Sequence, residues 1–194
     1  MEVIGTLIYM RSFIAIEIPE AIKKQMAEAQ DRLKGSGVEA SWTRPEGIHL
    51  TLKFLGEIPA ALVPDIEQAL SGAVSGRGRF RLAVGGVGAF PNANNARVAW
   101  IGLSGDLDPL TRLQEAVEDA MARLGMDREN RAFKPHLTLA RVKYIRSRDQ
   151  WRKALDEIRD IKLPEFEVTG VSLMKSELNR SGAVYTEIAK VELR

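Results

Sequence analysis

The chain has 194 residues, of which 45% are hydrophobic and 28% are charged, a composition typical of globular proteins rather than disordered or fibrous ones. No apolar run approaches the ~20 residues that a bilayer-spanning helix needs, so we expect no membrane partner. Cysteine is absent, which excludes disulfides, thiol chemistry and zinc–thiolate sites and suits a cytoplasmic location. Residues 1–9 carry Glu2 in place of a basic region, so we expect a short extension rather than a signal peptide.

Basic residues are concentrated in one segment of the chain. Residues 123–153 contain ten lysines and arginines against three acidic residues, a local charge of +7, although the whole chain carries only +2. A basic segment in an otherwise acidic chain indicates an anionic partner. Chance clustering of cations on a solvated face explains the same count equally well.

The first half of the chain alternates strand and helix patterns. An isoleucine-rich stretch opens it, Pro19 then begins a helix at a position where a missing N–H does no harm, and Gly35 ends that helix. The elements that the sequence predicts here are strand 11–18, helix 19–35, strand 47–55, helix 64–74, strand 80–84 and a loop over 85–95 whose glycine run, 85–88, is interpreted as a turn.

The second half repeats the same order. Its clearest helix has apolar residues at helical spacing and ends before Gly125, and Ser147 is a suitable residue to cap the next one. The elements that the sequence predicts here are strand 97–103, helix 106–124, strand 133–142, helix 147–160, strand 165–175 and strand 183–191, the last two joined by a turn at 179–182.

Two markers indicate an internal duplication. The strands predicted to begin at Arg11 and Arg97 lie 86 residues apart, and the tetrapeptide His-Leu-Thr-Leu occurs at His49 and again 87 residues later at His136. No linker of different composition separates the halves.

The duplication predicts the architecture. We expect a single α+β domain over residues 1–194, with approximate repeats at 11–90 and 97–191. Two sheets flanked by helices would then form two lobes, related by a pseudo-twofold axis, around a central cleft.

The repeated tetrapeptide contains both histidines of the chain. Because side chains alternate along a strand, His49 and Thr51 share one face, His136 and Thr138 share another, and the leucines point the opposite way. Two facing halves would bring two imidazoles and two hydroxyls together. Histidines, with an ordinary pKa of about 6.5, can divide acid and base roles near neutral pH. Hydroxyls are suited to holding a phosphate.

Two plainer explanations stay open. A duplicated fold could retain two structural histidines by descent. The second explanation is a metal site. Two histidines with no carboxylate on the same face supply too few ligands for a typical site, so we predict no metal. The sequence has no Gly-x-Ser-x-Gly elbow, no Walker-type phosphate loop and no Gly-x-Gly-x-x-Gly motif.

On these motifs, the sequence resembles the 2H phosphoesterase superfamily, which is named for two His-x-Thr/Ser-x motifs. Within it, the sequence is most similar to the bacterial and archaeal RNA 2′,3′-cyclic phosphodiesterases, historically called 2′-5′ RNA ligases. The residues before Arg11 depart from the family pattern and touch no motif. The segments that carry the resemblance are 11–19, 42–57, 88–91, 97–100, 133–141, 176–178 and 185–188.

The resemblance implies a two-lobed fold and a reaction. It implies opening of the terminal 2′,3′-cyclic phosphate of RNA or nucleotides to leave a 2′-phosphate, without metal or other cofactor. Some members also join tRNA halves by the reverse reaction, through a 2′-5′ bond and without ATP. We therefore expect a monomer whose partner is RNA or a nucleotide with a 2′,3′-cyclic phosphate.

The resemblance also assigns roles to individual residues. His49 and His136 would be catalytic, and Thr51 and Thr138 would bind the phosphate oxygens. We expect His136 to act as base and His49 as acid, although the symmetry of the two motifs leaves the reverse assignment open. Arg141 matches a substrate-contacting position of the family. Strict alternation places Arg141 on the leucine face, so it needs a strand bulge or the strand's end to reach the site.

Phe54 lies five residues after His49, as Arg141 does after His136, and we predict that it packs in the core. Two other functions remain open. One is a non-catalytic RNA-binding module of the same fold, and the other is a phosphodiesterase for another small cyclic nucleotide. The intact histidine pair argues against the first.

Overall fold

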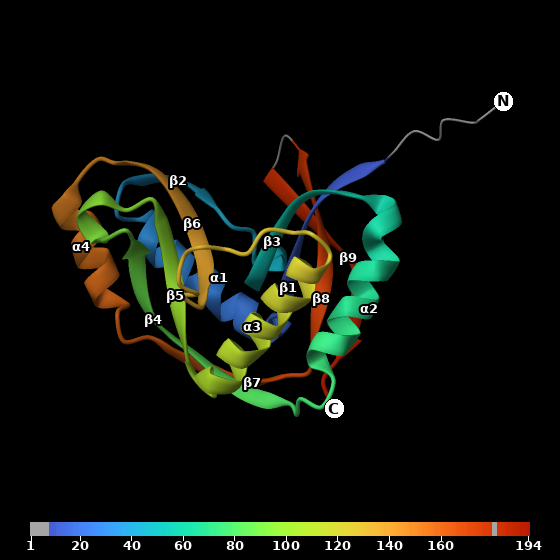
Figure 1. Cartoon of the computed structure of the whole chain (residues 1–194). Helices are drawn as coiled ribbons and strands as arrows, with labels where there is room; N and C mark the ends of the chain where they lie inside the picture. Colours follow the sequence, from blue (N-terminus) through green and yellow to red (C-terminus); the bar gives the residue numbers. More distant parts are fainter. Residues whose placement is uncertain (1–7, 180–181) are drawn as a thin grey trace.

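The computed structural model describes residues 8–179 and 182–194, which form two antiparallel sheets and four α-helices (Figure 1). In chain order the helices and strands are β1 (Tyr9–Glu17), α1 (Glu20–Lys34), β2 (Val38–Trp42), β3 (His49–Pro59), α2 (Val63–Val74), β4 (Phe80–Phe90), β5 (Val98–Gly105), α3 (Leu107–Arg123), β6 (His136–Ile145), α4 (Arg148–Glu157), β7 (Lys162–Val168), β8 (Gly170–Asn179) and β9 (Gly182–Glu192).

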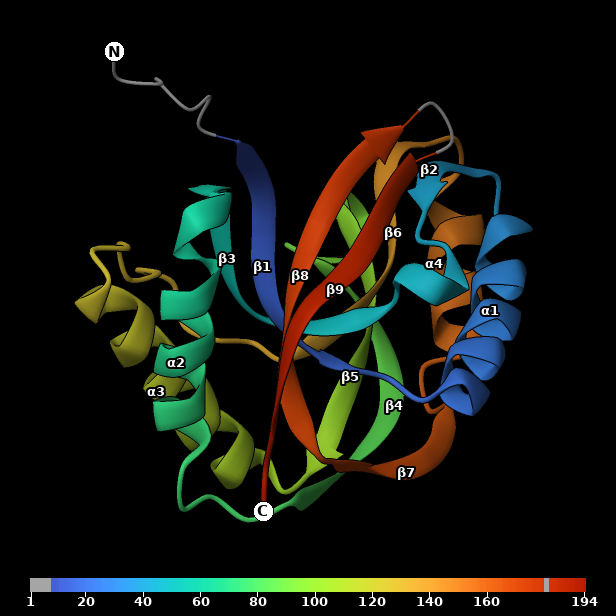
Figure 2. The same ribbon diagram turned by 90° about the vertical axis from the view of Figure 1, so that its right-hand side faces the viewer.

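Each sheet and two helices form one lobe, as the α+β prediction expects. One sheet has the strand order β3-β1-β8-β9 and is covered by α2 and α3, whereas the other has the order β2-β6-β5-β4-β7 and contacts α1. Helix α4 packs on α1. The two helix pairs lie on opposite flanks of the molecule, with the sheets between them (Figure 2).

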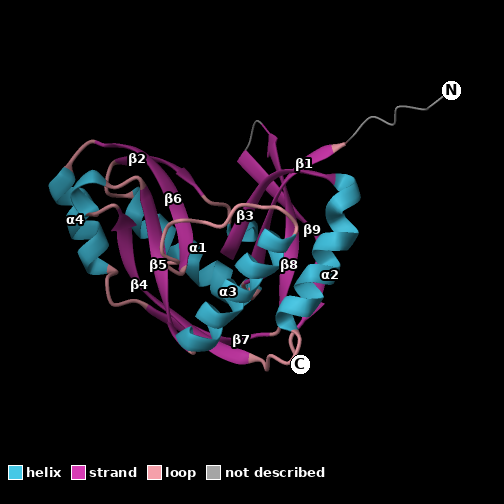
Figure 3. Ribbon diagram, in the orientation of Figure 1, coloured by secondary structure: helices cyan, strands magenta, loops and turns pink. Residues whose placement is uncertain are grey.

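The two lobes share one strand pattern. The order β3-β1-β8-β9 in the first matches β6-β5-β4-β7 in the second, which adds β2 at its edge. The halves of the chain are interleaved, because α1 contacts β6 and α3 contacts β3. The loop after α3 crosses from one lobe to the other before β6 begins (Figure 3). This interleaving favours our proposal of one domain, for which the repeat boundaries stay a prediction.

The predicted helices are confirmed, within a few residues at their ends. Helix α1 begins directly after Pro19 and ends before Gly35. The hydroxyl of Ser147 accepts a hydrogen bond from the backbone N–H of Gln150, so it caps α4 as its residue type predicts. None of the described helices combines the length and apolar character that crossing a bilayer requires.

The loop predicted over 85–95 is wrong for its first part, because β4 continues to Phe90. The glycine run lies inside the strand rather than in a turn. Gly86 has a φ of 70° where the pairing with β5 shifts register. The ring of Trp100 lies against Gly88, where an added Cβ would approach Trp100 Cζ2 to 2.4 Å. Gly86 therefore permits a bulge in β4, and Gly88 leaves the space that the ring of Trp100 occupies.

Two further predictions about strands are wrong. The sequence predicts no strand at Val38–Trp42, where β2 pairs with β6 at the edge of its sheet. The single strand predicted over 165–175 is two strands, β7 and β8, which belong to different sheets. The chain changes lobes between them at Thr169. The turn predicted at 179–182 includes residues 180 and 181, which lie outside the described residues.

Candidate active site

The two histidines begin two equivalent strands. His49 is the first residue of β3 and His136 the first of β6. These strands belong to different sheets but contact each other, so the two motifs meet where the lobes adjoin.

The alternation predicted for both motifs is confirmed. The four leucines of the two motifs are buried in the core, with 0 to 4% of their surface exposed. His49, Thr51, His136 and Thr138 are all half-buried on the opposite faces. Across the described residues, neither threonine hydroxyl makes a hydrogen bond within the chain, so both can bind a ligand.

A bulge interrupts each strand three residues after its histidine. In β3, Thr51 pairs with Ala15 and Lys53 with Ile14, which leaves Leu52 as the extra residue. In β6, Thr138 pairs with Trp100 and Ala140 with Ala99, which leaves Leu139 as the extra residue. Leu52 and Lys53 are consecutive buried residues, and so are Leu139 and Ala140.

The bulges change which face the next residue occupies. Arg141 is exposed and returns to the face of His136 and Thr138, and of the two routes expected for it, a bulge or the strand's end, the structure has the bulge. The core position predicted for Phe54 is wrong: it is 64% exposed, and its ring lies 6.1 Å from that of Phe13. Arg141 and Phe54 therefore occupy equivalent positions in the two halves.

Backbone carbonyls orient both imidazoles in the same way. His49 Nδ1 lies 2.7 Å from the carbonyl oxygen of Gly47, and His136 Nδ1 lies 2.7 Å from that of Lys134. Because a carbonyl oxygen only accepts, each Nδ1 carries the hydrogen. Each Nε2 is then the nitrogen left to exchange a proton with a ligand.

Aromatic rings enclose His49. The ring of Phe13 stacks on its imidazole at 4.4 Å, and Tyr185 of β9 meets it edge-on at 5.0 Å. This burial, reinforced by the nearby charge of Lys23, lowers the pKa of His49 from 6.5 to about 4, although the hydrogen bond to Gly47 acts in the opposite direction. His49 is therefore neutral in the free protein at pH 7.

This pKa predicts an acid-induced loss of stability. A histidine whose pKa is lower in the folded state leaves the unfolded state holding more protons between pH 6.5 and 4, so stability is present above pH 6.5 and is lost as pH falls toward 4. We expect the free energy of unfolding to decline by about 3 kcal/mol more for the wild type than for His49→Gln across this window. Urea titrations at pH 7 and 4 measure it, and equal declines would contradict the burial of His49.

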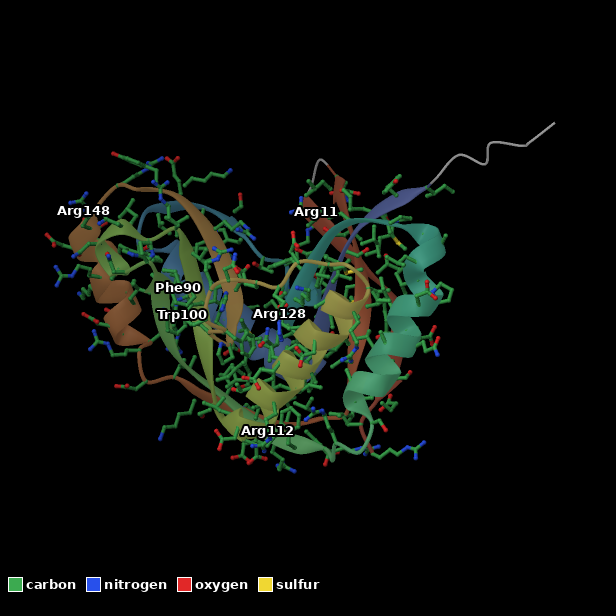
Figure 4. All side chains as sticks on the ribbon, in the orientation of Figure 1. Arg11, Phe90, Trp100, Arg112, Arg128 and Arg148 are labelled. Carbon is green, nitrogen blue, oxygen red and sulfur yellow. The ribbon has the colours of Figure 1, made fainter. Side chains whose placement is uncertain are left out.

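A different aromatic pair lies beside His136. Phe90 of β4 meets its imidazole edge-on at 5.1 Å, and Trp100 of β5 lies 5.1 Å from Phe90. Figure 4 shows Phe90 and Trp100 next to each other in one lobe. The resemblance segments contain Phe13, Phe90 and Tyr185, but nothing in the sequence pattern placed them against the histidines.

The basic segment 123–153 is only partly neutralised. Arg128 pairs with Asp119, Arg131 with Glu129, Arg146 with Glu39 and Lys153 with Glu157. Of the other cations, Arg141, Lys143, Arg148 and Arg152 make no ion pair with any described residue. Figure 4 shows the segment extending from Arg128 near the middle of the molecule to Arg148 at the outer end of one lobe.

No set of metal-binding side chains accompanies the histidines. In residues 8–179 and 182–194, no three His, Asp or Glu side chains gather closely enough to hold a metal ion.

Comparison with known proteins finds the same family in both halves. The model of the LigT-like phosphoesterase family matches residues 16–100 and, a second time, residues 101–185. A protein of Methanothermobacter thermautotrophicus named RNA 2′,3′-cyclic phosphodiesterase is 31% identical over 179 residues, which cover 92% of this chain and 96% of that protein. A protein of the same name from Thermotoga maritima is 35% identical over 176 residues, 91% of each chain.

Solved structures agree with the fold. The crystal structure of the protein TT0787 of Thermus thermophilus matches with a TM-score of 0.79 and 31% identity, covering 95% of this chain and 98% of that one. Escherichia coli LigT complexed with 3′-AMP matches with a TM-score of 0.77 at 24% identity over 96% and 99% of the two chains, and shows the fold alone. Because the family model matches both halves and these relatives span nearly the whole sequence, the chain belongs to the LigT-like phosphoesterases of the 2H superfamily.

Proposed function

We propose that the protein hydrolyses the terminal 2′,3′-cyclic phosphate of RNA or nucleotides to a 2′-phosphate. The observation that carries the proposal is the pair of equivalent strands, each presenting an imidazole with a free Nε2 and a free hydroxyl where the lobes adjoin. The names of the relatives at 31–35% identity support the same substrate class. Both strands come from one chain, so a monomer suffices.

The reaction needs one base and one acid at the same time. One imidazole takes a proton from water as the water oxygen bonds to phosphorus. The bond from phosphorus to the 3′ oxygen breaks, and the second imidazole gives its proton to that oxygen. Thr51, Thr138 and Arg141 hold the non-bridging oxygens as negative charge grows there. A 5′-hydroxyl in place of water would give a 2′-5′ linkage by the same steps.

The proposal also assigns the acid and base roles to individual histidines. The expectation is His136 as base and His49 as acid. The lowered pKa of His49 opposes it in the free protein, because an acid must be protonated. The negative charge of a bound cyclic phosphate acts the other way, since a nearby anion raises the pKa of an imidazole.

The sign of a pH dependence decides between the assignments. In His49→Ala, the residual rate depends on His136 alone. If His136 is the base, kcat/KM for adenosine 2′,3′-cyclic phosphate rises with pH as His136 loses its proton, and this is the result we expect. A rate that falls with rising pH would exchange the two roles. The wild-type profile alone cannot separate them, because both assignments give a bell-shaped curve.

The product tests the function itself. Phosphorus NMR of adenosine 2′,3′-cyclic phosphate incubated with the protein should show the 2′-phosphate. A 3′-phosphate product would mean that the substrate sits the other way round between the two equivalent strands. If the protein binds an oligonucleotide that ends in a cyclic phosphate but hydrolyses neither it nor this nucleotide, the RNA-binding module would be favoured. Turnover of other cyclic nucleotides alone would favour a different phosphodiesterase.

Chelation is expected to leave the rate unchanged. The proposed steps use only side chains of this protein, and no metal-binding cluster lies among the described residues. The hydrolysis rate should therefore be the same with and without excess EDTA. A loss on chelation that a divalent ion restores would contradict the two-histidine chemistry.

A further inference from the structure

A buried glutamine binds the carbonyl group of each strand bulge. Gln30 of α1 is 2% exposed, and its Nε2 donates to the carbonyl oxygens of Leu139 at 2.8 Å and Thr43 at 2.7 Å. Gln114 of α3 is 8% exposed, and its Nε2 donates to the carbonyl oxygen of Leu52 at 3.4 Å. Leu139 and Leu52 are the extra residues of the two bulges.

The two contacts are equivalent under the duplication. Leu52 and Leu139 each lie three residues after a histidine. Each glutamine comes from the half of the chain that does not contain the strand it binds: α1 precedes His49 but lies under β6, and α3 follows His49 but contacts β3. The glutamines therefore connect the two halves at the same point of each site strand.

The bulge is the feature that gives three residues of each strand a common face. With regular alternation, the residue five after each histidine would lie on the leucine face. The extra residue returns Arg141 to the face of His136 and Thr138, and it does the same for Phe54 in the other lobe. The carbonyl oxygen of Leu139 accepts one hydrogen bond from the backbone N–H of Thr43 at 2.9 Å, and Gln30 supplies a second donor that ties this point of the strand to α1. At Leu52 the side-chain donor is Gln114.

We propose that Gln30 and Gln114 are positioning residues that fix these bulges. They thereby direct Arg141 and Phe54 toward the bound substrate, on the same faces as Thr138 and Thr51. The proposal rests on the proposed function, because the position of Arg141 affects the rate only if Arg141 contacts the cyclic phosphate. Gln30 has the larger effect of the two, since its amide donates both hydrogens to backbone carbonyls and its strand carries the arginine.

Gln30→Met tests the proposal, because methionine keeps the length of the side chain and removes both donors. We expect kcat/KM for adenosine 2′,3′-cyclic phosphate to fall by roughly 10- to 100-fold, the range expected when a contacting group is displaced. In an Arg141→Ala background the same change should cost less than about threefold, because Gln30 acts through Arg141. Gln114→Met is the matched control, and its cost should persist in the Arg141→Ala background.

A merely structural role gives different results. Costs of Gln30→Met that multiply with those of Arg141→Ala would overturn the proposal. A crystal structure of Gln30→Met supplies a second readout, in which we expect the bulge at Leu139 to shift and Arg141 to leave the face of His136; an unchanged bulge would also overturn it. If Gln30→Met does not fold, Gln30→Asn, which keeps the amide on a shorter side chain, replaces it in both measurements. A wild type without turnover would refute the proposed function, and the crystal structure would still decide the positioning.

Discussion

Replacing either His49 or His136 with alanine is expected to lower the rate of cyclic-phosphate hydrolysis by about 10²–10⁴-fold, the usual contribution of a positioned acid or base. Each imidazole presents one free Nε2, because its Nδ1 hydrogen bonds to a backbone carbonyl two residues earlier. Alanine removes the proton carrier and leaves the buried leucine face intact. Single-turnover kinetics on adenosine 2′,3′-cyclic phosphate measures the change.

The double variant sharpens this prediction. Because acid and base act in one step, His49→Ala and His136→Ala together should cost less than the product of the single losses. Arg112→Ala is the matched surface control, since Arg112 is exposed on α3 (Figure 4) and should leave the rate unchanged. Near-normal activity in either folded histidine variant would end the two-histidine mechanism.

The face that carries the histidines could be predicted because it follows from a local rule. Alternation along a strand, together with two leucines in each motif, requires that the histidine and threonine point away from the core. The structure confirms this for both strands. The order of the helices was predictable for a similar reason, since apolar residues at helical spacing between Pro19 and Gly35, or before Gly125, are local signals.

A bulge was one of two routes expected to bring Arg141 to the site, and none was expected for Phe54. Alternation fails at one extra residue, and neither Leu52 nor Leu139 differs in type from the leucines around it. The carbonyl of each extra residue accepts a hydrogen bond from a glutamine on a helix far away in the sequence. A rule that uses only neighbouring residues therefore placed Phe54 in the core, whereas the structure exposes it beside Phe13.

The environment of His49 was unpredictable for the same reason. Its lowered pKa comes mainly from burial, and the stacked Phe13 and the edge of Tyr185 belong to strands at opposite ends of the chain. The missed strand β2 is a related case. It is a short edge strand whose partner, β6, lies nearly a hundred residues later. Tertiary contacts decided these features.

A second large effect is expected in the core behind His49. Lys53 is buried next to the bulge of β3, where its Nζ lies 2.6 Å from Glu118 Oε2 and 2.7 Å from the carbonyl oxygen of Asp127. Lys53→Met leaves the Glu118 carboxylate buried without its cation. Breaking one side of a buried ion pair costs about 3–5 kcal/mol, so we expect the free energy of unfolding to fall by about that amount in urea titrations.

Two matched variants distinguish the stability lost with this buried ion pair from the stability lost on removing any lysine charge. Lys34→Met removes a cation from an exposed pair with Asp31, whose length of 2.7 Å is close to the 2.6 Å of the buried pair, and should cost at most about 1 kcal/mol. Adding Glu118→Met to Lys53→Met removes the stranded carboxylate and should recover part of the lost stability. The recovery should be incomplete, because Glu118 also accepts a hydrogen bond from the backbone N–H of Glu129, in the loop that leads to His136. If Lys53→Met costs no more than Lys34→Met, the buried pair does not stabilise this lobe.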